Sequence, residues 1–233
     1  MADNTSQELA DIQRDFERVS PAIVEKASKF AASILADVAG RRGTVAGRIR
    51  PLSNATRIAG PAFTIEVRPG DNLMIHAAMA MAKPGDILVI DGKGDTSVAL
   101  MGAIMLSACK KLGFGGVVMD AAHRDTEELL ALGFPVYSVG ANPNGPTKNI
   151  SGRINWPITC GNTTVNPGDL IIGDADGVVV IEREKAASML ELATKKYDDE
   201  QVRLRAIAAG DVRPKWLESS LRSAGVLGVG ETL

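Results

Sequence analysis

Two continuous runs of apolar residues, at positions 87–90 and 117–119, limit most strongly what this chain can fold into. A strand that is apolar on both faces is typical of a sheet that is covered on both sides. Between the runs, apolar residues recur at helical spacing, which predicts a helix over residues 98–112 that ends at Gly113. Strand, helix and strand in this order form a βαβ unit and indicate an α/β fold.

Further strands are expected on both sides of this unit. Residues 44–49 and 62–67 alternate between apolar and polar side chains, as half-buried strands do. Residues 136–139 predict another buried strand. Residues 165–181 predict strand, tight turn and strand, with Asp176-Gly177 as the turn. We therefore expect a mixed sheet with helices packed against it.

Helices are expected at both ends of the chain. In the predicted N-terminal helices, residues 1–40, Ser20 followed by Pro21 is typical of a helix start. Asp71 is predicted to begin a helix that reaches residue 82, and another is expected over residues 125–132. The C-terminal helices are expected within residues 183–233, and nothing in the sequence marks a linker. We therefore predict a single domain, residues 1–233.

Composition excludes several classes of protein. The 233 residues carry a net charge of −2, which argues against a nucleic-acid-binding surface. No apolar stretch approaches the length needed to cross a membrane, and the polar, acidic first residues do not resemble a secretory signal. The two cysteines, Cys109 and Cys160, are too few for a disulfide framework. We therefore expect a cytoplasmic protein.

The segment after the second apolar run carries the first candidate chemistry. Ligands gather at the carboxyl ends of the strands in open α/β sheets, and Arg124 and Asp125 follow such a strand. Arg124 offers a planar fork that suits a carboxylate, and Asp125 offers oxygens that suit Mg²⁺ or Mn²⁺. The alternative is structural: Asp125 caps the next helix and Arg124 pairs with a surface acid.

The first apolar run is followed by glycines at positions 92, 94 and 102. A glycine-rich loop that enters a helix presents free backbone amides, and such a helix start binds anions. The alternative is a tight turn without a ligand. His76 and His123 form no recognisable zinc site, and His123 is a functional candidate only because it stands beside Arg124 and Asp125.

Taken in order, several short motifs resemble the RraA-like superfamily. They are Asp91-Gly-Lys-Gly-Asp95, Val98-Ala-Leu-Met-Gly102, Gly116-Val-Val-Met-Asp120, Arg124-Asp125, the segment from Pro167 to Val180, and Trp216-Leu217 with Leu221-Arg222 and Gly225. The resemblance implies a layered αββα sandwich-type fold with a mixed, partly barrel-like central sheet flanked by helices. The superfamily includes class II 4-hydroxy-4-methyl-2-oxoglutarate / 4-carboxy-4-hydroxy-2-oxoadipate aldolases and an inhibitor of ribonuclease E.

By position, the resemblance implies specific roles. The backbone amides of Gly102, Ala103, Ile104 and Met105 would receive the carboxylate of a small 2-oxo acid. Arg124 would contact the substrate and stabilise an enolate oxygen, and Asp125 would hold the divalent metal cation, Mg²⁺ or Mn²⁺. The implied activity is a metal-dependent lyase: a pyruvate aldolase, an oxaloacetate decarboxylase, or both.

The chain departs from the family pattern at one position. The aldolases carry an acid directly after the glycine that matches Gly102, where this chain has Ala103. That acid takes part in proton transfer. The family also draws a glutamate from the C-terminal region of a neighbouring subunit, and Glu200 matches it by rough position, with Asp199 as a competitor.

The resemblance implies a homo-oligomer, a trimer or a dimer of trimers, with sites between subunits. Two other functions stay open. The first is a non-catalytic RraA-like regulator that binds a ribonuclease or another protein, a reading that Ala103 favours. The second is a methyltransferase, which some family members are labelled as, although the expected cofactor fingerprint is absent from this sequence.

Overall fold

The computed structural model describes residues 11–233. The chain divides into two compact units, the first ending at Ala193 and the second running from Thr194 to Leu233. In the part of the chain that is described, no helix is both long enough and apolar enough to span a membrane.

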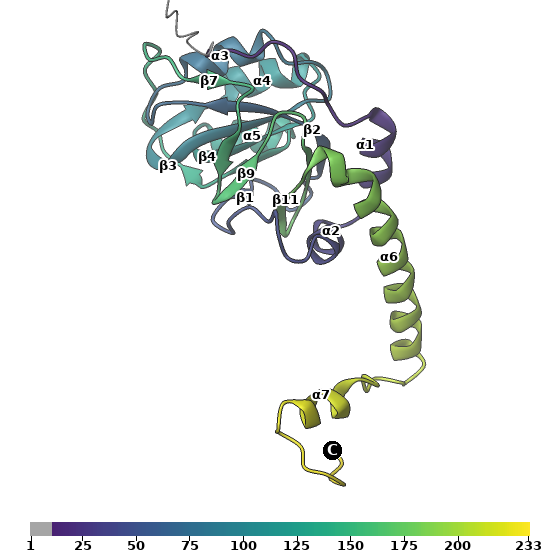
Figure 1. Cartoon of the computed structure of the whole chain (residues 1–233). Helices are drawn as coiled ribbons and strands as arrows, with labels where there is room; N and C mark the ends of the chain where they lie inside the picture. Colours follow the sequence, from purple (N-terminus) through teal and green to yellow (C-terminus); the bar gives the residue numbers. More distant parts are fainter. Residues whose placement is uncertain (1–10) are drawn as a thin grey trace, which may run out of the picture. The chain divides into compact units, whose positions relative to one another are not determined.

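The first unit is built on a nine-stranded mixed sheet that curls into a nearly closed barrel (Figure 1). The strand order is β1-β5-β4-β3-β2-β10-β11, with β6 beside β4 and β7 beside β2. Strands β2 to β5 pair in parallel, whereas β1, β7, β10 and β11 pair antiparallel. The strands are β1 (Arg50–Pro51), β2 (Ile58–Glu66), β3 (Ile87–Met101), β4 (Gly116–His123), β5 (Val136–Ser138), β6 (Gly140–Ala141), β7 (Arg153–Ile154), β10 (Leu170–Asp174) and β11 (Gly177–Ile181). A separate hairpin joins β8 (Ile158–Cys160) to β9 (Thr163–Val165).

The continuous apolar run at residues 87–90 supplies two different cores. Leu88 and Ile90 join the cluster that includes side chains of α3 (Leu73–Met79), α4 (Ala103–Lys111) and α5 (Thr126–Leu132). Ile87 and Val89 point the other way, into a cluster with side chains of β8, β9 and β10. Successive side chains of a strand face opposite sides of the sheet, so a strand covered on both sides must be apolar throughout. The prediction of a buried strand is confirmed.

A third core closes the antiparallel edge of the sheet. It joins side chains of α1 (Pro21–Ala27), α2 (Ala32–Val38) and the start of α6 (Ala186–Ala208) to β10 and β11. The predicted start at Ser20 is confirmed, because its Oγ accepts a hydrogen bond from the Ile23 amide at 3.3 Å. Residues 1–10 of the predicted N-terminal helices lie outside the described residues.

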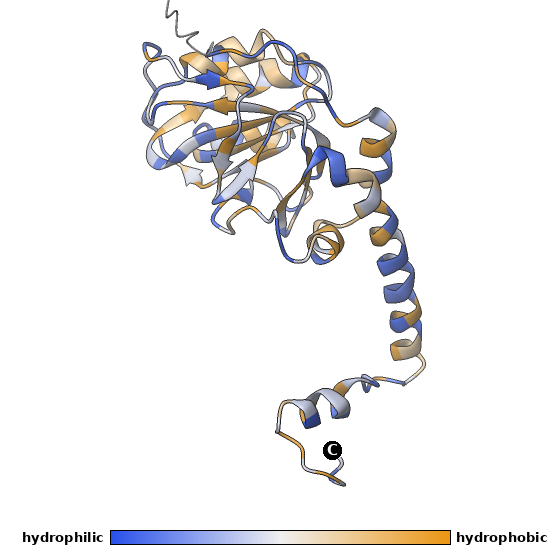
Figure 2. Ribbon diagram, in the orientation of Figure 1, coloured by the Kyte–Doolittle hydropathy of each residue, from blue (hydrophilic) through white to orange (hydrophobic). Residues whose placement is uncertain are grey.

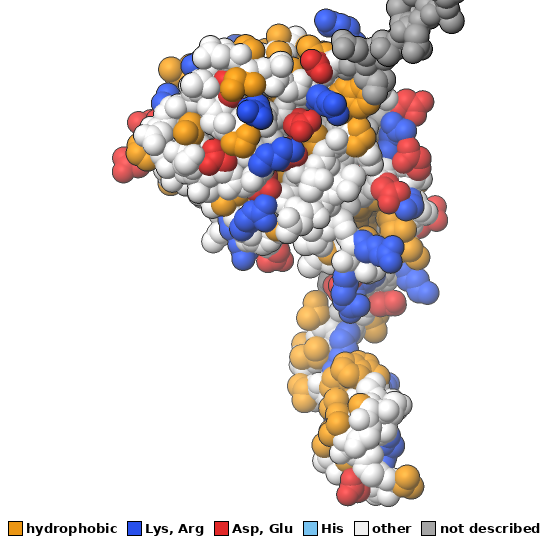
Figure 3. Space-filling model, turned by 60° about the vertical axis from the view of Figure 1, so that its left-hand side comes forward, with side chains coloured by type: hydrophobic (Ala, Val, Ile, Leu, Met, Phe, Trp, Pro, Cys, Tyr) orange, Lys and Arg blue, Asp and Glu red, His pale blue; other side chains and the backbone are white. Residues whose placement is uncertain are grey.

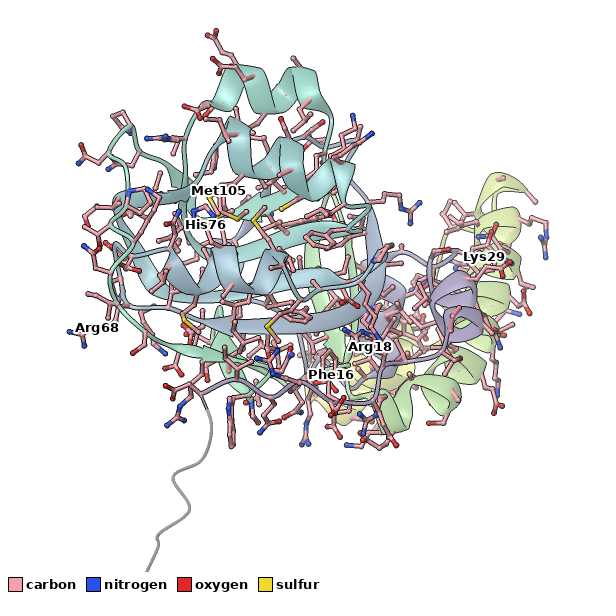
Figure 4. The ribbon with its side chains drawn as sticks, turned by 90° about the horizontal axis from the view of Figure 1, so that it is seen from above. Phe16, Arg18, Lys29, Arg68, His76 and Met105 are labelled. Atoms are coloured by element: carbon pink, nitrogen blue, oxygen red, sulfur yellow. The ribbon has the colours of Figure 1, made fainter. Side chains whose placement is uncertain are left out.

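The segment before α1 is held by an arginine. Arg18 donates two hydrogen bonds to the buried Asp86 carboxylate, at 2.7 and 2.8 Å. Its guanidinium carbon also lies 4.0 Å from the centre of the Phe16 ring, and the two side chains lie close together in Figure 4. The prediction of helix is wrong for residues 13–20, which form no helix.

Three sequence-based boundaries are wrong. The helix predicted from residue 98 begins at Ala103, because β3 continues to Met101 beside β4 through several register shifts. The glycines at 92 and 94 therefore lie within a strand. Residues 44–49 form no strand beyond a single bridge from Thr44 to Val179. The helix expected from residue 71 to 82 is α3, and Asn72 occupies its N-cap position.

The predicted hairpin at Asp176-Gly177 is confirmed, with Asp174 paired to Gly177 where β10 turns into β11. The predicted C-terminal helices are the 3₁₀ turn η1 (Arg183–Lys185), α6 and α7 (Leu217–Ser223). Helix α6 begins in the first unit and continues into the second, and hydrophobic and hydrophilic residues alternate along it (Figure 2).

Candidate active site

The two sequence segments singled out for chemistry lie side by side. Strands β3 and β4 are parallel neighbours, with Met101 opposite His123, so both chains leave the sheet at the same edge. The Arg124 amide donates a hydrogen bond to the Met101 carbonyl at 3.0 Å. This pairing brings the start of α4, at Gly102 to Met105, against the Arg124-Asp125 turn.

The Asp125 carboxylate reaches across to α4. Its Oδ2 accepts a hydrogen bond from the Ala103 amide at 2.9 Å. Asp125 occupies the N-cap position of α5, yet its side chain makes no capping hydrogen bond there. Arg124 Nε lies 3.7 Å from the same Oδ2. The geometry therefore contradicts the structural alternative in which Asp125 caps its own helix.

Gly102 is the residue that permits this contact. A Cβ atom at position 102 would lie 2.4 Å from Asp125 Oδ2 and 2.8 Å from Arg124 Cγ. Backbone and side chains at such distances overlap, so any larger residue would push the arginine and the aspartate away from α4. The glycine thus serves close approach here and not a tight turn, because its φ of −142° is extended.

These residues border a small cavity of about 170 Å³. Gly102, Ile104, Met105, Arg124 and Asp125 all line it. Ala103 contributes its amide to Asp125 and is not part of the lining. A larger groove of about 940 Å³ lies elsewhere, between the end of α2 and the start of α6, and contains none of the predicted site residues.

Three further polar side chains line the cavity. His76 comes from α3 and lies beside Met105 of α4 in Figure 4. Asn72 is buried, and its Nδ2 donates to the Leu100 carbonyl at 2.8 Å. Lys148 comes from the long connection after β6. Sequence reasoning missed Asn72 and Lys148, since neither stands in a recognisable motif.

The cavity has a cationic character. Arg124 and Lys148 bring positive side chains, and Asp125 is the only carboxylate among the described residues of the lining. The amides of Ile104 and Met105 belong to the first turn of α4, where the backbone has no carbonyl of its own helix to bond. Such amides carry partial positive charge, so the start of α4 is suited to an anion.

Another predicted site residue, Glu200, is not among the residues that line this cavity. Glu200 lies on α6 in the second unit, where its carboxylate is 3.1 Å from Lys196 Nζ.

Burial raises the pKa of the Cys109 thiol to about 12, and burial likewise raises the pKa of the Cys160 thiol, with Asp120 and Asp91 adding to that rise. Neither thiol is suited to act as a nucleophile.

A divalent cation fits the site in one particular way. Within residues 11–233, no three His, Cys, Asp or Glu side chains gather as a metal cage. Mg²⁺ commonly binds through one or two carboxylates and fills its other positions with water and substrate oxygens. Asp125 is partly exposed at the cavity, and only its Oδ2 is engaged by the Ala103 amide. The donor set thus fits an open, water-rich site and not a closed one.

The fold and this cavity together define an α/β protein in which a helix start suited to an anion faces an arginine and a carboxylate. The family model RraA-like (Aldolase/RraA) matches residues 11–180. The chain therefore belongs to the RraA-like family, and the matched region includes every predicted site residue except Glu200.

Individual relatives carry different names. A protein of Halalkalibacterium halodurans named "Putative 4-hydroxy-4-methyl-2-oxoglutarate aldolase" is 44% identical over 160 residues, which are 69% of this chain and 76% of that protein. Streptomyces coelicolor RraAS2, described as an unusual member of the RNase ES inhibitor RraA family, shares the fold with a TM-score of 0.74 and 24% identity, over 85% of this chain and all of that one. A Geobacillus kaustophilus protein titled as a dimethylmenaquinone methyltransferase gives a TM-score of 0.61 and 28% identity, over 66% and 95% of the two chains.

Proposed function

We propose that this protein is a divalent-metal-dependent lyase that cleaves a carbon–carbon bond of a 2-oxo acid through a pyruvate enolate. One observation carries the proposal: the α4 amides, the Arg124 guanidinium and the Asp125 carboxylate meet at one small cavity. The name of the Halalkalibacterium relative supports the same class of substrate. The cavity is also below the roughly 300–1,000 Å³ of pockets for drug-sized ligands, which disfavours a methyltransferase cofactor at this site.

The start of α4 binds the substrate carboxylate. The amides of Ile104 and Met105 point along the helix axis toward the cavity end, where the helix dipole favours negative charge. Lys148 adds a positive charge on the same cavity. A 2-oxo acid bound in this way directs its ketone toward Arg124 and Asp125.

Arg124 acts on the oxygen where charge develops. When the carbon–carbon bond breaks, its electron pair moves into the new double bond and the ketone oxygen becomes an enolate oxygen. A guanidinium placed beforehand at that oxygen stabilises the charge without rearranging. A divalent metal held by Asp125 would supply Lewis-acid stabilisation of the same charge. A proton from water then adds to the terminal carbon of the enolate, which yields pyruvate.

The leaving fragment determines whether a base must remove a proton as the carbon–carbon bond breaks. Oxaloacetate loses carbon dioxide from a carboxylate, and no proton has to be removed first. An aldol substrate must give up its hydroxyl proton as the bond breaks. Ala103 cannot accept that proton, so we propose that decarboxylation proceeds faster than aldol cleavage in this protein.

A coupled assay for pyruvate release tests this function. We expect turnover of oxaloacetate or 4-hydroxy-4-methyl-2-oxoglutarate with Mg²⁺ or Mn²⁺, and its loss on chelation. Asp125→Ala and Arg124→Ala should each lower kcat/KM by about 100-fold or more, since each removes a group that stabilises the enolate. Asp176→Asn, at the exposed hairpin tip, is the matched control. Absence of metal-dependent release, or unchanged turnover in Asp125→Ala, would contradict the proposal.

A second candidate is a non-catalytic regulator that binds another protein. Ala103 favours it, because an enzyme that has lost its function can also lose its proton-transfer acid. The Streptomyces structure shows that ribonuclease inhibitors are described on this fold. A purified ribonuclease that co-elutes with this chain, together with no turnover of any 2-oxo acid, would support it.

A further inference from the structure

His123 is a buried histidine that the proposed reaction does not use. It is the last residue of β4, and both ring nitrogens have partners. Its Nδ1 lies 2.8 Å from Ser138 Oγ, and its Nε2 lies 3.1 Å from Thr126 Oγ1. Because a hydroxyl can donate and accept, both contacts are hydrogen bonds in either tautomer.

The hydrogen bond between His123 and Thr126 spans the two site residues, Arg124 and Asp125. Only Arg124 and Asp125 separate His123 from Thr126 in the sequence. Asp125 lies in the left-handed region, with φ 61° and ψ 46°. This conformation is unfavourable in residues other than glycine, so the surrounding structure must hold it.

Backbone contacts hold the beginning of the turn. The Arg124 amide is bonded to Met101, and the Asn142 amide donates to the His123 carbonyl at 2.9 Å. The far end of the turn is Thr126, where α5 begins. The side-chain bond from His123 to Thr126 holds this end, together with the backbone bond from the Leu129 amide to the Asp125 carbonyl at 3.0 Å.

We propose that His123 is a positioning residue: through Thr126 it keeps Asp125 left-handed, with its carboxylate on the Ala103 amide. His123 does not line the cavity. The inference rests on the proposed function for its catalytic consequence, but the geometry that it predicts can be measured without turnover.

Amide hydrogen exchange at Ala103 reports the geometry directly. We expect His123→Phe and Thr126→Val to speed this exchange markedly, because the Asp125 acceptor leaves when the turn relaxes. Thr64→Val is the matched control, since it also removes a threonine hydroxyl: that of Thr64 donates to the Trp156 carbonyl at 2.7 Å, away from the turn. It should leave the Ala103 amide protected. If His123→Phe does not fold, Thr126→Val alone carries the test.

Conservative replacements separate positioning from general stability. A glutamine places its terminal amide near the position of the histidine Nε2 and can reach Thr126, whereas an asparagine reaches only toward Ser138. We therefore expect His123→Gln to restore protection of Ala103 and His123→Asn to fail, at similar unfolding midpoints. Loss of a residue that orients a metal ligand typically costs about 10–100-fold in metal affinity or activity, and we expect this loss in Mn²⁺ affinity and in kcat for His123→Phe.

Failure of the positioning role and failure of the proposed lyase function would give different results. If the wild-type protein turns over no 2-oxo acid, the lyase proposal is wrong, and the exchange experiment still decides the role of His123. If Ala103 exchanges at the wild-type rate in both His123→Phe and Thr126→Val, the positioning role is overturned, even where turnover falls.

Discussion

Single residues determine how closely the two halves of the site approach each other. Gly102 leaves room for Asp125 Oδ2, and Asp125 adopts a left-handed backbone conformation that turns its carboxylate toward α4. Ala103 supplies an amide to this contact but no acid. The cavity thus has groups suited to an anion and to a cation, whereas Ala103 offers no group that could accept a proton.

Ala103→Asp tests whether the missing acid at this position limits aldol cleavage. An aspartate at the first position of α4 is compatible with the helix dipole and returns a carboxylate to the edge of the cavity. We expect aldol cleavage to rise by about 10-fold or more, in the range of general-base contributions, while oxaloacetate decarboxylation changes little. Ala103→Asn is the control of equal size. An equal effect of both variants on both substrates would contradict the assigned role.

At the residue scale, the sequence predicted the candidate residues but not their arrangement. Arg124, Asp125 and Gly102 could be singled out because they stand at strand ends and in family motifs. The left-handed conformation of Asp125 has no sequence signal, since aspartate is common at helix starts in ordinary conformations. Lys148 could not be found, because a long connection with no periodic pattern brings it to the cavity.

Among the elements, the boundary between β3 and α4 was predicted wrongly. The apolar spacing from residue 98 fits a helix, but the register shifts beside β4 keep the chain extended to Met101. Pairing with a neighbouring strand outweighed local periodicity. By contrast, the hairpin of β10 and β11 was predicted correctly, because Asp176-Gly177 is a strong local turn signal.

The loop that carries Lys148 is tied to α3 by Asp71. Its carboxylate accepts hydrogen bonds from Thr147 Oγ1 at 2.6 Å, from the Asn149 amide at 2.7 Å and from the Leu73 amide at 2.9 Å. Burial alone raises the pKa of Asp71, but these hydrogen bonds outweigh it and hold the pKa below 3.8. The ionised carboxylate therefore stabilises the fold.

This arrangement predicts how stability depends on pH. A carboxyl whose pKa is lower in the folded state contributes stability above its unfolded pKa of 3.8 and loses it as the pH falls through the folded pKa. Asp71→Asn should lower the free energy of unfolding near neutral pH by about 1–2 kcal/mol. The variant should also lose less stability on acidification. Urea unfolding between about pH 7 and pH 3 measures both, and parallel curves for wild type and variant would contradict the prediction.

In the whole molecule, the second unit presents many apolar side chains to solvent (Figure 3). The exposed residues include Val202, Leu204, Val212, Trp216, Val226 and Val229. Large exposed apolar patches are typical of surfaces that meet another protein. We propose that they pack in a homo-oligomer, a trimer or a dimer of trimers, in which Glu200 of one chain completes the site of another.

A crystal structure of the protein with pyruvate and Mg²⁺ would show directly whether this cavity binds the proposed substrate and metal. We predict pyruvate in the cavity, with its carboxylate on the amides of Ile104 and Met105, Arg124 on its ketone oxygen, and the cation on Asp125. Pyruvate bound away from α4, or a cation bound without Asp125, would contradict it.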